Sequence, residues 1–147
     1  MNLSDIPLRL TTGAYILHAG IEKWSGDEER AAGVHGMAAG TYPVLDKVPP
    51  VQFLRLLAAG EIATGLALLS PMVSNAKAGA ALTAFSGGLL GLYAKTPGMR
   101  KPGSVWPTAQ GTGISKDVWM FGIGLALLGD AWSGRRTRRA RARHARA

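Results

Sequence analysis

The sequence predicts an all-α integral membrane protein, a bundle of four transmembrane helices. Residues 51–70 form an apolar segment that, at about 1.5 Å per residue, can cross roughly 30 Å of bilayer hydrocarbon. Three other apolar segments have comparable length, and polar stretches rich in proline and glycine separate them. An arginine-rich stretch directly follows the last segment, as is common beside a membrane span. The expected spans are residues 8–24, 51–70, 77–94 and 117–133.

Composition agrees with one membrane domain and a separate tail. The chain has 147 residues, no cysteine and a net charge of +8. Without cysteine, disulfides, thiolate metal sites and thiol redox chemistry by its own side chains are excluded. We divide the chain into a transmembrane domain, residues 1–133, and a disordered tail, residues 134–147, which is too charged to fold alone. No basic region precedes the first apolar segment, so we expect residues 1–24 to stay as a signal anchor.

The first segment has two distinct faces. Gly13 and Gly20, seven positions apart, mark a stripe where another backbone can come close. Trp24 at the end of the segment suits an interfacial aromatic belt. A polar stripe follows helical spacing and consists of Thr11, Ala14, His18 and Glu22.

The second segment carries Glu61 near its middle. An ionisable side chain at that depth costs about 2.5 to 3.5 kcal/mol on insertion scales, so it is expected to face protein. Glu61 shares a stripe with Ala58 and Gly65, which predicts that it faces a closely packed helix. Two roles stay open for it: a carboxyl hydrogen-bonded to a neighbouring helix, or a proton-relay or ligand-contact group.

The third segment and the connections predict packing and surface structure. Small residues recur every four positions at Gly79, Thr83, Gly87 and Gly91, which favours helix packing over a ligand groove. The connection at residues 25–50 is long enough to hold a short surface helix or to cover the outer mouth of the bundle. His35 within it is expected to be a solvated loop histidine. The connection at residues 95–116 is again broken by proline and glycine.

Charged residues inside the spans sort by depth when the helices alternate in direction. Depth follows from the distance of a residue to the middle of its segment, at about 1.5 Å per residue. The level matches are Arg55 with Glu22 toward the outer side, Arg9 with Asp130 toward the inner side, and His18 with Glu61 near the centre. For the first two pairs a plain helix clamp is expected. Arg55 and Glu61 point about 120° apart on one helix and should contact different neighbours.

Two interpretations compete for the tail. A run of arginines can bind nucleic acid through phosphates. Directly after a span it more often sets topology and touches anionic lipid, and we favour this interpretation over nucleic-acid binding. With four spans, a cytoplasmic tail implies a cytoplasmic N-terminus as well.

Short motifs along residues 6–132 resemble the DoxX family of small four-helix bacterial membrane proteins. The resemblance rests on Arg9 at the entry of the first helix, on G-x-x-x-x-H-A-G-I-E-K-W at residues 13–24, on G-E-I-A-T-G-L-A-L-L at residues 60–69, and on K-D-V-W at residues 116–119. Each motif is weak alone, and their order and spacing together carry the likeness. The resemblance implies that Arg9, Lys23 and Glu61 occupy recurrent polar positions of the family.

The family implies an accessory or anchoring subunit of a membrane redox assembly, linked to quinone or to thiol and oxidative stress. Expected partners are membrane lipid, redox partner proteins and further copies of the chain. The cofactor stays unknown, with a quinone as the candidate. No metal site is expected, and no catalytic motif is visible. The candidate intramembrane polar site comprises Glu61, His18, Arg55, Glu22, Arg9, Asp130 and Lys23.

Two alternatives to this function are open. The first is a small proton-coupled or solute transporter that uses Glu61, although no internal repeat is evident. The second is a DNA-tethering or lipid-organising protein that acts through its tail. A soluble enzyme is the least expected class, because the chain has no nucleophile elbow, P-loop, dinucleotide-binding motif or H-E-x-x-H metal motif.

Overall fold

The computed structural model describes the backbone of residues 5–144 and the side chains of residues 5–133. Within these residues the protein is all-α, as predicted, and its only strand-like feature is an isolated bridge between Arg100 and Pro107. The long helices are α1 (Asp5–Trp24), α3 (Pro50–Leu69), α4 (Asn75–Lys95) and α6 (Asp117–His144). Shorter helices connect them: α2 (Glu28–Thr41), the 3-10 helix η1 (Pro43–Lys47) and α5 (Thr112–Ser115).

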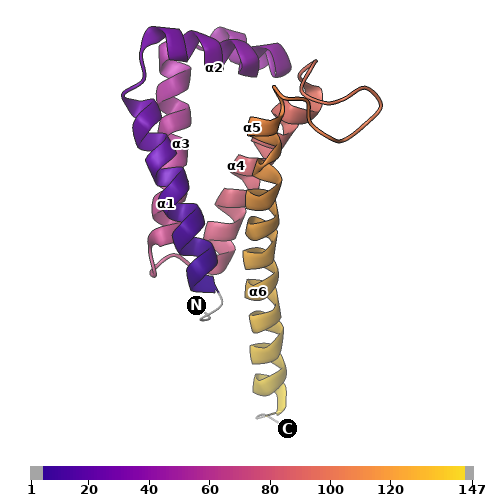
Figure 1. Ribbon diagram of the computed structural model, residues 1–147. Coiled ribbons are helices and arrows are strands. Elements are labelled where there is room, and N and C mark those ends of the chain that lie inside the picture. The colour runs from indigo at the N-terminus through magenta and orange to yellow at the C-terminus, as the bar shows by residue number, and fades with distance from the viewer. Residues whose placement is uncertain (1–4, 145–147) are drawn as a thin grey trace.

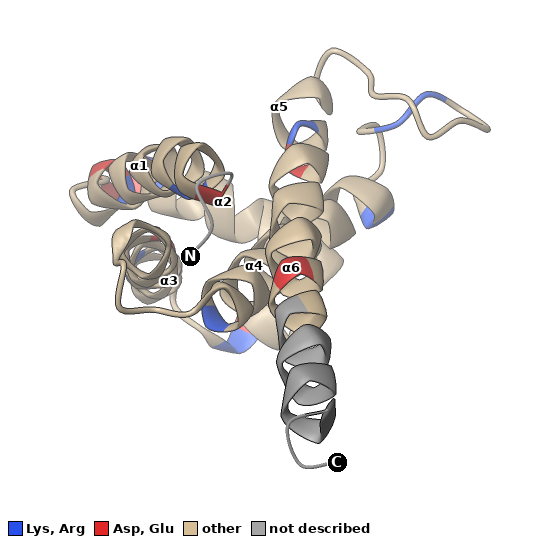
Figure 2. Ribbon diagram, turned by 90° about the horizontal axis from the view of Figure 1, so that it is seen from below, with Lys and Arg blue, Asp and Glu red and all other residues tan. Residues whose placement is uncertain are grey.

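The long helices form two pairs. Helix α1 packs mainly against α3, and α4 packs mainly against α6 (Figure 1). An end-on view shows α1 and α3 on one side of the molecule and α4 and α6 beside them (Figure 2). The start of α1 and the end of α6 lie at the same end of the molecule, and α2 lies across the opposite end (Figure 1). The long helices therefore alternate in direction.

Small residues bring the helices of each pair close together, as the glycine spacing predicted. A Cβ atom at Gly20 of α1 would lie 2.9 Å from the Cβ atom of Glu61 in α3. In the other pair, a Cβ atom at Gly79 of α4 would lie 2.8 Å from the carbonyl oxygen of Gly124 in α6. A side chain at either position would force the helices apart, so these glycines set the distance between the two backbones.

Local sequence starts and ends the helices in ordinary ways. The Asp27 side chain accepts a hydrogen bond from the Arg30 amide and begins α2, and Ser74 does the same for the Lys77 amide at the start of α4. Pro43 and Pro50 stand in the first turns of η1 and α3, where a missing amide hydrogen costs nothing. The prediction of a short surface helix between residues 25 and 50 is confirmed by α2.

Helix α2 joins the two pairs at their far end. The Tyr42 hydroxyl, just after α2, donates a hydrogen bond to the Gly88 carbonyl of α4, and the Thr41 and Thr96 hydroxyls lie 2.8 Å apart. The expectation of a solvated loop histidine at residue 35 is wrong: His35 lies on α2, is partly buried, and its ring nitrogen lies 3.0 Å from the Leu45 carbonyl oxygen. These contacts hold the connection against the bundle.

The helix bounds differ from the expected spans mainly at α6. Its backbone continues helically past Ser133 to His144, into the stretch expected to be a disordered tail. Arginine and alanine are both good helix formers, and extending an existing helix is easier than starting one. The side chains of residues 134–147 lie outside the described part of the structure.

Three charged side chains, Asp5, Arg9 and Glu61, are buried, while many large apolar side chains are exposed. The central cluster is small and consists of Ile16, Leu68, Ala78, Leu82 and Leu127. Meanwhile Arg9 is 2% exposed and Glu61 is 5% exposed, whereas large apolar side chains such as Trp119 are exposed. Among the described residues, α3 is the one helix long and apolar enough to cross a membrane, and one third of its apolar stretch is buried inside the molecule.

Candidate functional site

A buried ion pair joins α1 and α3. The Lys23 ammonium lies 2.9 Å from Oε1 of Glu61 and also donates a 3.5 Å hydrogen bond to the Ala19 carbonyl. Glu61 is buried, and the Lys23 side chain is 19% exposed. Because the carboxylate is buried, the pair retains more of its Coulomb attraction than an ion pair on the surface.

The sequence places the pair through helical spacing. Lys23 follows Gly20 by three positions and Ile16 by seven, so all three lie on the face of α1 that meets α3. Gly20 has no side chain, and Glu61 fits against the backbone at that position. The Lys23 side chain leans back toward the start of its helix, as long side chains in helices do, and so reaches the carboxylate.

One oxygen of the carboxylate is left over. Oε2 of Glu61 is buried and has no hydrogen-bond partner among the described residues. The Thr83 hydroxyl is the other such buried atom there, but it is uncharged. A buried polar atom without a partner costs free energy, more so when it is charged, and such atoms often mark a place where a ligand, water or proton binds.

Charged groups from the other helix pair approach this ion pair. Asp117, at the start of α6, is partly buried and interacts electrostatically with Lys116, Glu61 and Lys23. Glu61 and Lys23 thus lie close enough to Asp117 to interact with it electrostatically.

Arg9 forms a second buried charged centre, at the opposite end of α1. Its Nε donates to the Leu68 carbonyl, and Nη2 donates to the Ala67 and Ser70 carbonyls, all at 2.8 Å. These carbonyls belong to the end of α3, where helix geometry leaves oxygens without partners. Nη1 donates to the Val73 carbonyl at 2.9 Å and to Oδ1 of Asn75 at 2.8 Å. All five N–H donors of the guanidinium are used.

Asn75 extends the Arg9 centre to the other helix pair. Its Nδ2 donates to Oδ2 of Asp5 at 2.7 Å and to Oδ2 of Asp130 at 3.3 Å. The expected pairing of Arg9 with Asp130 is therefore replaced by a shared contact in which both residues bond to Asn75. This centre ties α1, the end of α3, the start of α4 and α6 together.

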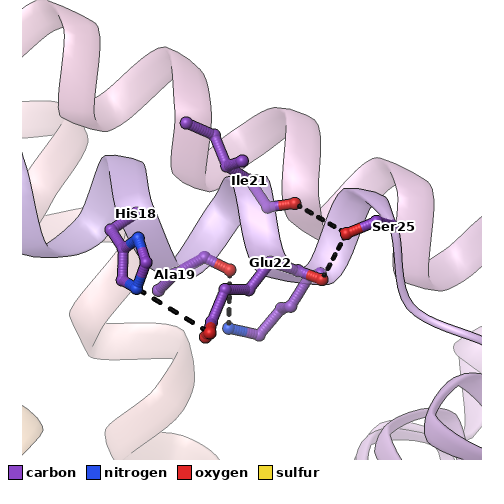
Figure 3. Close-up of polar contacts among 6 residues, drawn as sticks. His18, Ala19, Ile21, Glu22 and Ser25 are labelled. Carbon is purple, nitrogen blue, oxygen red and sulfur yellow. Dashed lines mark hydrogen bonds and ion pairs between the residues drawn. The ribbon is translucent and has the colours of Figure 1, made fainter.

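The structure does not bring together the other two expected pairs. His18 lies 3.7 Å from Oε1 of Glu22, four positions away on the same helix, and the His18 side chain is 73% exposed (Figure 3). Glu61 is paired with Lys23 instead of His18. Among the described residues Arg55 has no ion pair, and its guanidinium lies 5.4 Å from the centre of the Trp24 ring rather than beside Glu22.

These two differences have one physical cause. Depth along the membrane places residues at a level but says nothing about their direction around the helix. The predicted polar stripe of α1 exists, but it is the exposed face, because α3 packs against the glycine stripe. His18 lies two positions before Gly20, about 200° around the helix, and so points away from Glu61.

The candidate site also includes residues that sequence reasoning did not name. Asp5 and Asn75 are buried parts of the Arg9 centre, and Asp117 faces the Lys23 and Glu61 pair. Each lies in the first turn of a long helix, outside the middle of a span where charges draw attention. If matching by depth had included the ends of the helices, Asp5, Asn75 and Asp130 would have fallen at the same depth.

Among the described residues, no three His, Asp or Glu side chains gather in a way that could hold a metal ion. At the buried ion pair, the polar groups that a ligand could contact are the second carboxylate oxygen of Glu61, which has no partner among the described residues, and the Lys23 ammonium beside it. Comparisons of the chain with family models, with characterised proteins and with solved structures find no match.

Proposed function

We propose that this protein is an integral membrane protein whose four long helices, α1, α3, α4 and α6, span the bilayer. The burial pattern carries the proposal: Arg9 and Glu61 are buried, and many large apolar side chains are exposed. A core helix of a soluble protein would be mostly buried, whereas two thirds of the apolar stretch of α3 is not. Helices α1 and α4 are less apolar, and the buried polar contacts of α1 lower its cost in lipid.

Within the membrane, we propose that the chain is an accessory subunit of a quinone-linked redox assembly, as its resemblance to the DoxX family suggests. The supporting observation is the free oxygen of Glu61 beside the Lys23 ammonium. A quinone needs a donor for its carbonyl, and its reduced form needs an acceptor for its hydroxyl; Lys23 and Glu61 offer both. The bound quinone would supply the electron chemistry, and these two residues would hold and orient it.

The exposed face of α1 supports a partner protein. His18 and Glu22 lie on a helix that we place in the membrane, and their side chains are 73% and 55% exposed. Ionisable residues within spans almost always face protein or a water-filled cavity. A second subunit that covers this face would remove the cost of exposing His18 and Glu22 to lipid. This face therefore fits a subunit of an assembly better than a protein that acts alone.

The test is to extract the protein gently from its native membrane and measure the bound quinone in wild type and in Glu61→Gln. The expected result is quinone bound to the wild type and at least about tenfold less bound to Glu61→Gln, since a hydrogen bond to a charged group is worth about 1.5 to 3 kcal/mol. Glu22→Gln is the matched control, because it removes an exposed carboxylate of the same helix pair. A wild type without quinone, or a Glu61→Gln protein that keeps it, would overturn the proposal.

A second candidate is proton-coupled transport. It is favoured by the interaction of Asp117 with Glu61 and Lys23, which places titratable groups of both helix pairs near one another. Its expected result is a response to a pH gradient in proteoliposomes that disappears in Glu61→Gln and persists in Glu22→Gln. Quinone-loaded wild type that moves no protons would decide for the redox role.

A further inference from the structure

A groove runs along the outer side of the α1 and α3 pair. Its volume is about 550 Å³. Its lining includes Ala59, Ala63 and Leu66 of α3 and Ile21 of α1. Neither Lys23 nor Glu61 lines it, so it is separate from the candidate quinone site. Its lining is almost entirely apolar, which suits a hydrocarbon chain.

The groove has a charged end. Arg55 precedes Ala59 by four positions and so lies on the same stripe of α3, one turn beyond the groove. Its guanidinium lies 5.4 Å from the centre of the Trp24 ring, and Trp24 lines the groove. Ser25 completes this end, with its hydroxyl turned back to the Ile21 and Glu22 carbonyls of its own helix (Figure 3).

Arg55 lacks an anionic partner. It is partly buried, and no carboxylate pairs with it among the described residues. A tryptophan beside an arginine is typical of the level at which lipid head groups begin. An arginine also binds phosphate well, through its planar fork of donors. The stripe from Arg55 to Leu66 is about 16 Å long at 1.5 Å per residue, which fits most of an acyl chain.

We propose that this groove is a binding site for an anionic glycerophospholipid, with the phosphate at Arg55 and Trp24 and one acyl chain along Ala59, Ala63 and Leu66. Charge selects the occupant: a neutral amphiphile would fill the groove but leave Arg55 without an anion. The inference shares the membrane placement proposed above and does not depend on quinone. A protein that fails to insert into membranes would contradict the proposed function, whereas an inserted protein without lipid preference would contradict only this inference.

The test uses the full-length protein in detergent, supplied with equal amounts of phosphatidylglycerol and of a neutral galactosyl diacylglycerol that has the same acyl chains but no phosphate, and native mass spectrometry of the retained lipid. The wild type is expected to retain phosphatidylglycerol in preference to the other lipid. In Arg55→Gln the ratio of the two retained lipids is expected to fall about tenfold, which corresponds to the loss of one hydrogen bond to a charged group. Arg55→Lys should keep part of the preference. Arg100→Gln is the control, because Arg100 is an exposed arginine of the loop after α4.

The chain pocket is tested separately. Ala63→Leu fills the groove and should lower retention of phosphatidylglycerol while Arg55 is intact. Ala84→Leu is its control, since Ala84 is an exposed alanine on α4 outside the groove. Helix content and a single peak in gel filtration verify that each variant is folded. Equal retention of the two lipids by wild type, or identical behaviour of Arg55→Gln and Arg100→Gln, would overturn the proposal.

Discussion

The two buried charges, Arg9 and Glu61, are satisfied to very different degrees. Arg9 uses every donor of its guanidinium, on four backbone carbonyls and one side chain. Glu61 is as deeply buried, but one of its carboxylate oxygens has no partner among the described residues. A fully satisfied buried charge can act as a structural joint, whereas a half-satisfied one reduces stability unless something else binds there. The difference supports the proposal that Arg9 serves the fold and that Glu61 contacts a ligand.

Arg9→Met is expected to cause the largest loss in the free energy of unfolding. The substitution keeps an apolar side chain of similar length but leaves buried carbonyl oxygens at the end of α3 without donors. We expect the free energy of unfolding to fall by about 3 to 5 kcal/mol, the cost of breaking a buried charged network. The measurement is denaturant unfolding of the purified protein in detergent micelles. Arg100→Met, in an exposed loop, should unfold like the wild type; a stable Arg9→Met protein would show that the centre at Arg9 is dispensable.

Lys23→Met should have the next largest effect, because it leaves the Glu61 carboxylate buried without its cation. We expect a loss of about 2 to 4 kcal/mol, within the range for unpaired buried charges. The double variant Lys23→Met/Glu61→Gln should recover most of that loss, since no charge is then left over. Additive effects of the two substitutions in the same unfolding assay would mean that the residues are not coupled.

Asn75→Ala tests the link between the two helix pairs. It removes the donor to Asp5 and Asp130 and the acceptor for Arg9, so about 1 to 3 kcal/mol should be lost. Hydrogen exchange gives a local measurement of the same loss, because the amides at the start of α4 should exchange faster in the variant. Unchanged exchange there would mean that other contacts hold the pairs together.

The smallest change in the free energy of unfolding is expected for a Gly→Ala substitution at a glycine that faces open space. A Cβ atom at Gly88 of α4 would meet nothing within 4 Å, whereas one at Gly79 would meet α6. Gly88→Ala should therefore be neutral or stabilise by up to about 1 kcal/mol through helix propensity, and Gly79→Ala should destabilise. The same unfolding assay compares them. Equal behaviour of the two variants would contradict the close α4 and α6 contact.

Sequence patterns predicted the helices and their contact stripes well. Apolar length located all four long helices, and glycine spacing identified the packed faces at Gly20 and Gly79. These features are local or periodic along the chain, so they can be recognised in the sequence without knowledge of the fold. The stripe of Ala58 and Gly65 likewise pointed Glu61 toward a close neighbour, which is α1.

The partners of the charges could not be predicted in the same way. Matching by depth paired Glu61 with His18, but the rotation of α1 about its axis decides the partner, and that rotation is set by packing on Gly20. Lys23 was out of register by depth and reaches Glu61 because its side chain is long and flexible. Asn75 carries no charge, so matching charged residues by depth could not identify it.

The most direct test of the contrast between the two centres is the unfolding free energy of Glu61→Gln beside that of Arg9→Met. The amide introduced by Glu61→Gln would keep a hydrogen-bond acceptor for Lys23, and Lys23, close to the end of α1, can turn toward water. We expect the free energy of unfolding of Glu61→Gln to stay within about 1.5 kcal/mol of the wild type, while Arg9→Met loses at least twice as much. A Glu61→Gln protein as unstable as Arg9→Met would contradict it, because Glu61 would then be as structural as Arg9.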